Sequence, residues 1–190
     1  MKASLKVIYS PTRLASRINA LGRKISQDFA GRTVDVVIVL ESSFVFAADL
    51  MRRISAPVVC HFVRADVRDV VQGEHERREV FFSHSPRLEG RDVLVVDAVL
   101  HTGVTQDFLC KRLQESRPRS LRLAVLLDKP RERRVDLKPD YFGFVAASNY
   151  LAGYGLAGSR GWYRNLPYIG ARPPQGRRRS ARAGQARQAR

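Results

Sequence analysis

The sequence predicts an α/β fold with a mainly parallel sheet flanked by helices, on three observations. Continuous apolar runs without alternation recur along the chain, and segments with helical spacing lie between several of them. Runs of this kind are typical of strands that are buried on both faces in a parallel sheet. The chain has 190 residues, 44% of them hydrophobic, which suits one domain with a single core. Alternation of strand and helix through most of the chain then favours the α/β class.

A helix is predicted to begin at Ser10-Pro11, with the serine hydroxyl as N-cap and proline in the first turn. The apolar positions that follow are three or four residues apart and form one helix face. They are Leu14, Ile18, Leu21, Ile25 and Phe29. Gly31 is expected to end the helix.

The next segments alternate between strand and helix. Residues 34–40 (VDVVIVL) form a predicted buried strand, residues 43–54 a helix, and residues 57–63 (PVVCHFV) a second buried strand. The polar residues 64–78 are expected to form a mobile loop. A short strand is predicted at residues 79–84.

The second half repeats the pattern. Residues 92–100 (DVLVVDAVL) and 120–128 (SLRLAVLLD) are strong strands, residues 103–113 form the helix between them, and residues 141–147 form a fifth strand. In such sheets ligands bind beyond the carboxyl ends of the strands. The polar residues at those ends are therefore the candidates for a functional site.

The net charge of +16 is concentrated at the carboxyl end. Residues 172–190 contain seven arginines, no acid and almost no apolar residue, which leaves +9 for residues 1–171. The sequence therefore predicts a domain at 1–171 and a disordered basic tail at 172–190. A basic tail can bind nucleic acid through phosphate contacts, or it can be a solvated extension. The charge of the remainder fits a polyphosphate-binding enzyme as well as an RNA binder.

Membrane and secretion signals are absent from the sequence. No apolar run approaches the roughly 20 residues of a membrane helix, and the amino terminus lacks a signal-peptide pattern. A cytoplasmic protein is expected. Cys60 and Cys110 fit neither a disulfide framework nor a zinc site, and both are expected to be buried reduced thiols.

The most informative segment is VLVVDAVLHTGVT at residues 93–105. A strand ends near Asp97, and a Thr-Gly-x-Thr turn then opens into a helix. Backbone N–H groups, the hydroxyls of Thr102 and Thr105 and the helix N-terminus form an anion cradle, which Gly103 lets an anion approach closely. Taken alone, an ordinary strand–helix turn remains an alternative.

The surrounding residues resemble a known family. The segment at 93–105 is similar to the phosphoribosyl pyrophosphate (PRPP) signature of type I phosphoribosyltransferases. LLDKPRERRVDLKPDYFGF, GYGL and WYRNLPYIG resemble the hypoxanthine-guanine phosphoribosyltransferases in particular, and LESSFVFAADLMRRI resembles their pyrophosphate-loop segment. The resemblance covers roughly residues 14–170. It implies the type I phosphoribosyltransferase fold with a small hood, and a homo-oligomer, either dimer or tetramer.

The resemblance also implies ligands for the retained residues. The 5′-phosphate of PRPP or of a purine nucleotide would be held by the loop Thr102, Gly103, Val104 and Thr105. Arg164 would contact pyrophosphate, as a charged bidentate donor suits. Three residues would bind the base: Lys129 donates to the 6-oxo group, Tyr150 stacks on the ring, and the Leu151 backbone reads the ring edge.

Several residues differ from the family pattern at positions that take part in the reaction. Asp97 matches the first of two acids, so it could bind the ribose hydroxyls or a magnesium-bound water. Ala98 replaces the second acid and weakens the Mg²⁺ site. The family's general acid–base aspartate matches His101, whose imidazole can shuttle protons near neutral pH.

The pyrophosphate loop and the lid also differ. Glu41-Ser42 puts a negative charge in the pyrophosphate loop, which is repulsive unless Glu41 turns away. The Ser-Tyr pair of the family's mobile lid is missing, and Ala157 stands where a second magnesium aspartate is expected.

Two functions follow as hypotheses. The first is purine salvage with impaired activity, in which a purine base and PRPP give a nucleoside monophosphate and pyrophosphate, with His101 as the proton-transfer group. The alternative is a catalytically degenerate regulator that binds a nucleotide or phosphate and, in one variant of this hypothesis, RNA.

Overall fold

The computed structural model describes residues 5–72, 75–82, 86–146 and 150–171 of the chain. The predicted basic tail at 172–190 lies outside the described residues. Its disorder and its contact with nucleic acid therefore stay predictions.

A six-stranded sheet forms the body, in the order β4-β3-β2-β5-β6-β7. All neighbouring strands are parallel except β3 and β4, which pair antiparallel. The strands are β2 Val34–Leu40, β3 Val58–Gln72, β4 His75–Phe82, β5 Asp92–Leu100, β6 Ser120–Asp128 and β7 Tyr141–Val145. This arrangement confirms the predicted mainly parallel α/β sheet.

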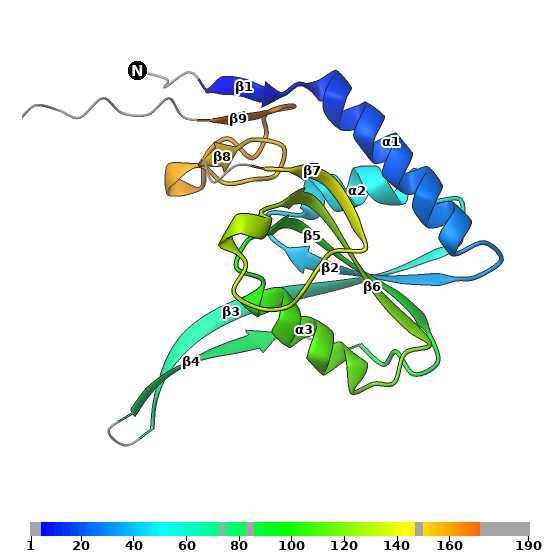
Figure 1. Ribbon diagram of the computed structural model, residues 1–190, viewed down its shortest axis with the longest axis vertical. Helices are drawn as coiled ribbons and strands as arrows, with labels where there is room; N and C mark the ends of the chain where they lie inside the picture. The colour runs from blue at the N-terminus through cyan, green and yellow to red at the C-terminus, as the bar shows by residue number, and fades with distance from the viewer. Residues whose placement is uncertain (1–4, 73–74, 83–85, 147–149, 172–190) are drawn as a thin grey trace, which may run out of the picture.

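Helices cover both faces of this sheet (Figure 1). Helices α1 (Pro11–Asp28) and α2 (Phe44–Met51) lie on one face, and α3 (Val104–Gln114) lies on the other. Each face has its own apolar core cluster, and α1 and α2 contribute to one while α3 contributes to the other. The amphipathic face predicted for α1 is confirmed, since its five apolar positions are all buried. Ser10 caps the helix and accepts a hydrogen bond from the Arg13 N–H at 3.3 Å.

Both ends of the described chain meet in a second, antiparallel sheet of order β1-β9-β8. Its strands are β1 Lys6–Tyr9, β8 Leu151–Ala152 and β9 Ile169–Ala171, and two short 3₁₀ helices, η1 Pro130–Glu132 and η2 Ser159–Gly161, complete the fold. This small unit is the predicted hood. No helix in the described ranges has both the length and the apolar character needed to span a bilayer.

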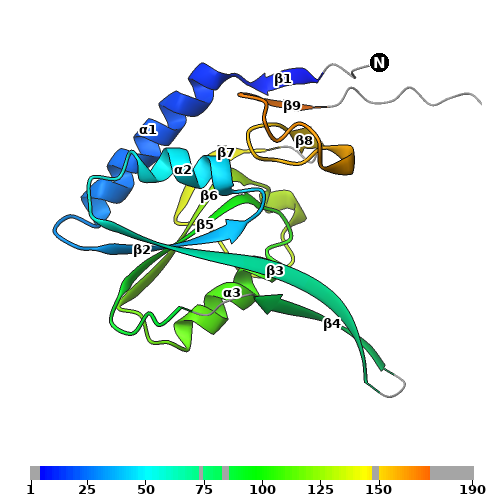
Figure 2. The ribbon, with the colours of Figure 1, turned by 180° about the vertical axis from the view of Figure 1, so that it is seen from behind.

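The predicted loop at residues 64–78 is wrong. Strand β3 continues to Gln72, and β4 pairs with it from Ala65↔Phe82 to Gln72↔His75. The two strands form a ribbon that extends away from the body in both views (Figures 1 and 2). Such a ribbon satisfies its backbone hydrogen bonds by pairing, so it needs no continuous apolar run to form. The polar and charged composition of residues 64–78 therefore did not indicate these two strands.

The prediction that residues 57–63 are fully buried is also wrong. Val63 is buried, but Val59, Cys60 and Phe62 are exposed. This part of β3 pairs only with β2, because the pairing with β4 begins at Ala65. It therefore lies at the edge of the sheet. The other thiol is partly covered, and burial raises the pKa of Cys110 to about 12.

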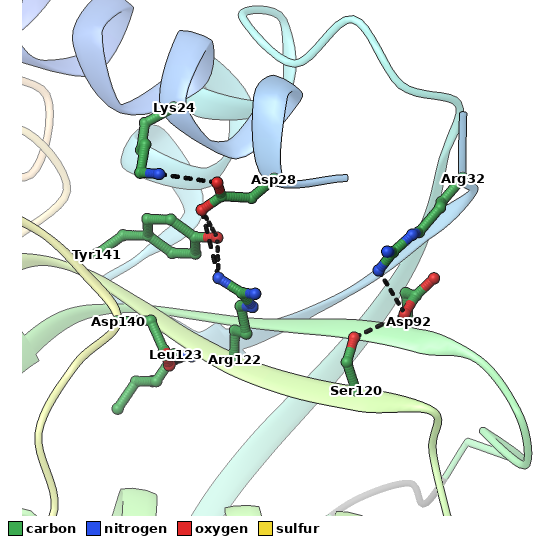
Figure 3. A network of polar contacts seen from close by, with 9 residues as sticks. All are labelled: Lys24, Asp28, Arg32, Asp92, Ser120, Arg122, Leu123, Asp140 and Tyr141. Atoms are coloured by element: carbon green, nitrogen blue, oxygen red, sulfur yellow. Dashed lines mark hydrogen bonds and ion pairs between the residues drawn. The ribbon is translucent and has the colours of Figure 1, made fainter. Parts of the chain in front are cut away.

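One buried and one half-buried carboxylate, Asp92 and Asp28, anchor the end of the sheet at which β5 and β6 begin (Figure 3). Asp92, at the start of β5, accepts hydrogen bonds from Arg119 Nε at 3.1 Å and Ser120 Oγ at 2.7 Å. Asp28, at the end of α1, is bound by Lys24, Arg122 and Tyr141. The hydrogen bond from Arg119 is the main reason that the pKa of Asp92 lies below its ordinary value.

Asp92→Asn is expected to lower the free energy of unfolding by about 2 kcal/mol at pH 7, because it removes the buried carboxylate that accepts hydrogen bonds from Arg119 and Ser120. For a chain of this size the melting temperature should fall by about 4–8 °C.

The effect should depend on pH. Since the folded pKa of Asp92 lies below its ordinary value of 3.8, its contribution to the free energy of unfolding is complete above that value. It is lost as the pH falls through the folded value. Melting curves at pH 7, 4 and 3 should show the wild-type advantage shrinking, with the exposed Asp136→Asn as control. An advantage that is constant with pH would contradict this explanation.

Candidate active site

A pocket of about 340 Å³ opens where the carboxyl ends of the central strands meet the hood. Its volume is within the range of small-molecule sites. Three groups of residues line it: those that end or follow β2, β5 and β6, those of η1, and those of the hood. They are Ser42, Val99, His101, Leu127, Lys129, Glu132, Tyr150, Leu151, Leu156 and Ala157. The structure thus brings together five of the predicted site residues, His101, Ser42, Lys129, Tyr150 and Leu151.

The three predicted base-binding residues approach the pocket from two sides. Lys129 directly follows β6, and its backbone N–H donates to Leu100 O at 3.0 Å. Its side chain is only 14% exposed, so the ammonium group is held close to the pocket. Tyr150 and Leu151 belong to the hood, and the Tyr150 hydroxyl lies 3.5 Å from Ala157 O. A planar ligand between these two sides would meet an aromatic face and a hydrogen-bond donor.

His101 follows β5 and hydrogen-bonds through Nε2 to Glu132 Oε2. This bond is the main reason that the pKa of Glu132 lies below its ordinary value. Sequence reasoning missed Glu132. The available signal was its position three residues after Lys129 in KPRE, because residues i and i+3 of a 3₁₀ helix lie on the same side.

The predicted phosphate loop is built around Gly103, which has φ +82° and precedes α3. A Cβ at this position would lie 2.8 Å from Val135 Cγ2. Thr102 O accepts a hydrogen bond from the Arg134 N–H at 2.9 Å, so the segment after β6 also supports the loop. The first N–H groups of α3 have no partner within the helix and can bind an anion.

Gly103→Ala is expected to destabilise the protein by about 1–3 kcal/mol more than Gly90→Ala. Both glycines have positive φ, but a Cβ at Gly90 would meet nothing within 4 Å. The second variant therefore measures the backbone cost alone, and the difference measures crowding of the loop. Chemical denaturation of both variants checks this. Equal losses would mean that the loop accommodates a side chain.

Asp97 lies in β5 but does not line the pocket. Its Oδ1 accepts from the Ala98 N–H at 2.6 Å and its Oδ2 from Gln106 Nε2 at 2.7 Å. The residue is only 8% exposed, and burial raises the pKa of its carboxyl to about 6. Ala98 is packed in the core cluster beneath α1 and α2. Asp97 would therefore have to leave its partners in order to reach a ribose or a metal ion.

The three predicted pyrophosphate residues are in contact with one another. Arg164 donates to Gly155 O at 2.7 Å, to Ser42 Oγ at 3.3 Å and to Glu41 Oε2 at 3.2 Å. The other oxygen of Glu41 lies 3.6 Å from Arg64 Nη2. The negative charge of Glu41 is thus balanced by two arginines, and Glu41 occupies part of the donor set that the resemblance assigned to pyrophosphate.

The predicted magnesium site retains few of the acids that the family resemblance implies. Within the described part of the chain, no group of three or more His, Cys, Asp or Glu side chains is arranged to share an ion. Asp97 is the one predicted ligand, and both of its oxygens already accept hydrogen bonds. The positions where the family resemblance implies further acids are Ala98 and Ala157.

Comparison with protein families identifies the domain type. The model of the phosphoribosyl transferase domain matches residues 4–156. A hypoxanthine-guanine phosphoribosyltransferase of Lactococcus lactis is 30% identical over 92% of this chain and 94% of its own length. A bifunctional protein TilS/HprT of Listeria monocytogenes is 36% identical over 90% of this chain, which spans only 26% of that protein.

The fold comparison agrees with the sequence comparison. The crystal structure of a hypoxanthine-guanine phosphoribosyltransferase from Bacillus anthracis superimposes with a TM-score of 0.80 at 33% identity. The match covers 90% of this chain and 99% of that one. The overall fold is therefore shared with that solved structure.

Proposed function

The chain belongs to the hypoxanthine-type phosphoribosyltransferase family, and from this premise we propose that it transfers a phosphoribosyl group from PRPP to a 6-oxopurine. The products are a nucleoside monophosphate and pyrophosphate. The observation that carries the proposal is the convergence of Lys129, Tyr150 and His101 on one pocket at the strand ends. A cytoplasmic homo-oligomer is part of the proposal.

Different retained residues bind different parts of the two substrates. Lys129 can only donate hydrogen bonds, which favours a 6-oxo group over the 6-amino group of adenine. The aromatic face of Tyr150 stacks on the ring and the Leu151 backbone reads its edge. The loop of residues 102–105 holds the 5′-phosphate, and Arg164 with Ser42 holds the pyrophosphate.

In the reaction a purine ring nitrogen forms a bond to C1′ of the ribose while the bond from C1′ to the pyrophosphate oxygen breaks. The nitrogen loses its proton to His101, and pyrophosphate leaves with the electron pair of the broken bond. Arg164 stabilises the charge that develops on the leaving group. We assign no step to a metal ion.

We propose that turnover is slow for this family. Asp97 is held away from the pocket by Gln106, Ala98 and Ala157 offer no carboxylate, and Glu41 competes for Arg164. Magnesium is commonly held by one or two carboxylates together with substrate phosphates. A weakened magnesium site is therefore part of this proposal.

The test is release of pyrophosphate from PRPP, supplied with magnesium, in the presence of hypoxanthine, guanine or xanthine between pH 6 and 9. Turnover with at least one 6-oxopurine, and much less with adenine, is the expected result. No turnover with any of them, together with measurable binding of nucleoside monophosphate, would overturn the proposal and point to a binding protein.

A further inference from the structure

We propose that Glu132 is a positioning residue of the transfer site, which fixes the His101 imidazole on one side and the Lys129 ammonium on the other. This inference rests on the proposed transferase function. Glu132 ends η1, lines the pocket together with both residues, and is the only acid among the described residues of that lining.

The two carboxylate oxygens have separate partners. Oε2 bonds to His101 Nε2, and Oε1 lies 4.0 Å from Lys129 Nζ. Oε1 is buried and has no hydrogen-bond partner among the described residues. At 4.0 Å the carboxylate attracts the Lys129 ammonium group electrostatically, but the distance is too long for a hydrogen bond, so no N–H group of the lysine is used. Lys129 thus keeps its donors for the 6-oxo group of a base, at a position that the carboxylate maintains.

The bond to His101 also determines the tautomer of the ring. An ionised carboxylate only accepts hydrogen bonds, so Nε2 must carry the hydrogen that is donated to Glu132. Nδ1 of the neutral ring is then left with its lone pair. It is the nitrogen that can take a proton from the purine, in the way that a carboxylate orients the histidine of other proton-transfer sites.

Glu132 also supplies charge that the histidine lacks. When Nδ1 takes the purine proton, the ring becomes a cation beside a developing ribosyl cation, and Glu132 is the counter-ion in contact with it. Other charged groups lie close by: Lys129 lines the same pocket, and Arg133, which pairs with Asp128, reaches Leu100 O next to His101 in the sequence. That pair is internally neutral, and Lys129 is a cation. Removing Glu132 therefore leaves the protonated ring next to uncompensated positive charge.

The experiment compares the wild type with Glu132→Gln and Glu132→Asp, and uses the exposed Glu115→Gln as control. Glu132→Gln should lower kcat by about 10–100-fold. Glu132→Asp should restore part of the rate, and Glu115→Gln should match the wild type. An unchanged kcat in Glu132→Gln would overturn the inference.

A second measurement separates this inference from the proposed function. ¹⁵N NMR of the imidazole, assigned with a His101→Asn variant, reports the tautomer without any turnover. The wild-type ring should carry its hydrogen on Nε2, and Glu132→Gln should show a mixture of tautomers. If no turnover is found but this difference appears, the positioning role stands and the transferase proposal fails. If both proteins show the same mixture, Glu132 does not fix the ring. Melting curves confirm that the variants are folded.

Discussion

His101→Asn lowers kcat with a 6-oxopurine by about 10²–10⁴-fold, the range expected for loss of a general acid–base group. Asparagine keeps a polar side chain at the pocket but cannot take the purine proton. Because the His101 side chain is half-exposed, the variant should melt at the same temperature as the wild type. Single-turnover measurements with saturating PRPP check the result. A loss confined to KM would instead assign His101 to substrate binding.

The variant His101→Asp provides the matched control for this result. It restores the residue that the family resemblance implies at this position, but it puts a second carboxylate close to Glu132, and the two like charges repel each other. His101→Asp alone should therefore remain slow. Combining it with Glu132→Gln should recover activity, since the like-charge repulsion is then removed. Equal rates in the single and double variants would contradict the coupling between residues 101 and 132.

The sequence was sufficient to predict the central architecture because burial leaves a local signal. Strands β2, β5 and β6 lie in the interior of the sheet, so each is a continuous apolar run, and the spacing in α1 marks its buried face. The β3–β4 ribbon carries no such signal. Its strands pair with each other through backbone hydrogen bonds, and pairing leaves little trace in a single sequence.

The local geometry of the candidate site was predictable where a motif determines the backbone conformation, but not where side chains contact partners from other elements. Gly103 is required by its φ of +82° and by Val135, and both constraints act on the loop itself. The partners of Asp97 and His101, which are Gln106 and Glu132, come from other elements. No periodicity records such contacts. The prediction that Glu41 repels the ligand did not take Arg64 and Arg164 into account, because they too come from other elements.

The position of Ala98 in strand β5 limits the restoration of the missing second acid. Neighbouring residues of a strand face opposite sides, so Asp97 and Ala98 point to different cores. Ala98 is 1% exposed among apolar side chains. A carboxylate there would need a partner or solvent, and burying it without one is costly. Restoring an acid at 98 alone would therefore first destabilise the fold.

Arg164→Met is expected to lower kcat/KM for PRPP by about 10²–10³-fold, the cost of losing one donor to a developing oxyanion. Arg164 reaches Ser42 and Glu41 across the site, and methionine keeps the length of the side chain without its charge. Arg164 also donates to Gly155 O, so loss of this contact to the hood contributes to the effect. Arg164→Lys separates the contribution of the charge from that of the bidentate geometry, because it keeps the first and loses the second.

Glu41→Gln is the counterpart of Arg164→Met, and it should strengthen the binding of pyrophosphate. The carboxylate of Glu41 is an internal competitor for Arg64 and Arg164, and it is 55% exposed, so the pairs are weak. Pyrophosphate should therefore bind about two- to five-fold more tightly to Glu41→Gln than to the wild type. Calorimetric titration at low and high salt checks this, and the gain should shrink with salt because exposed charges are screened. Weaker binding in Glu41→Gln would mean that Glu41 orders the two arginines for the ligand instead of competing with it.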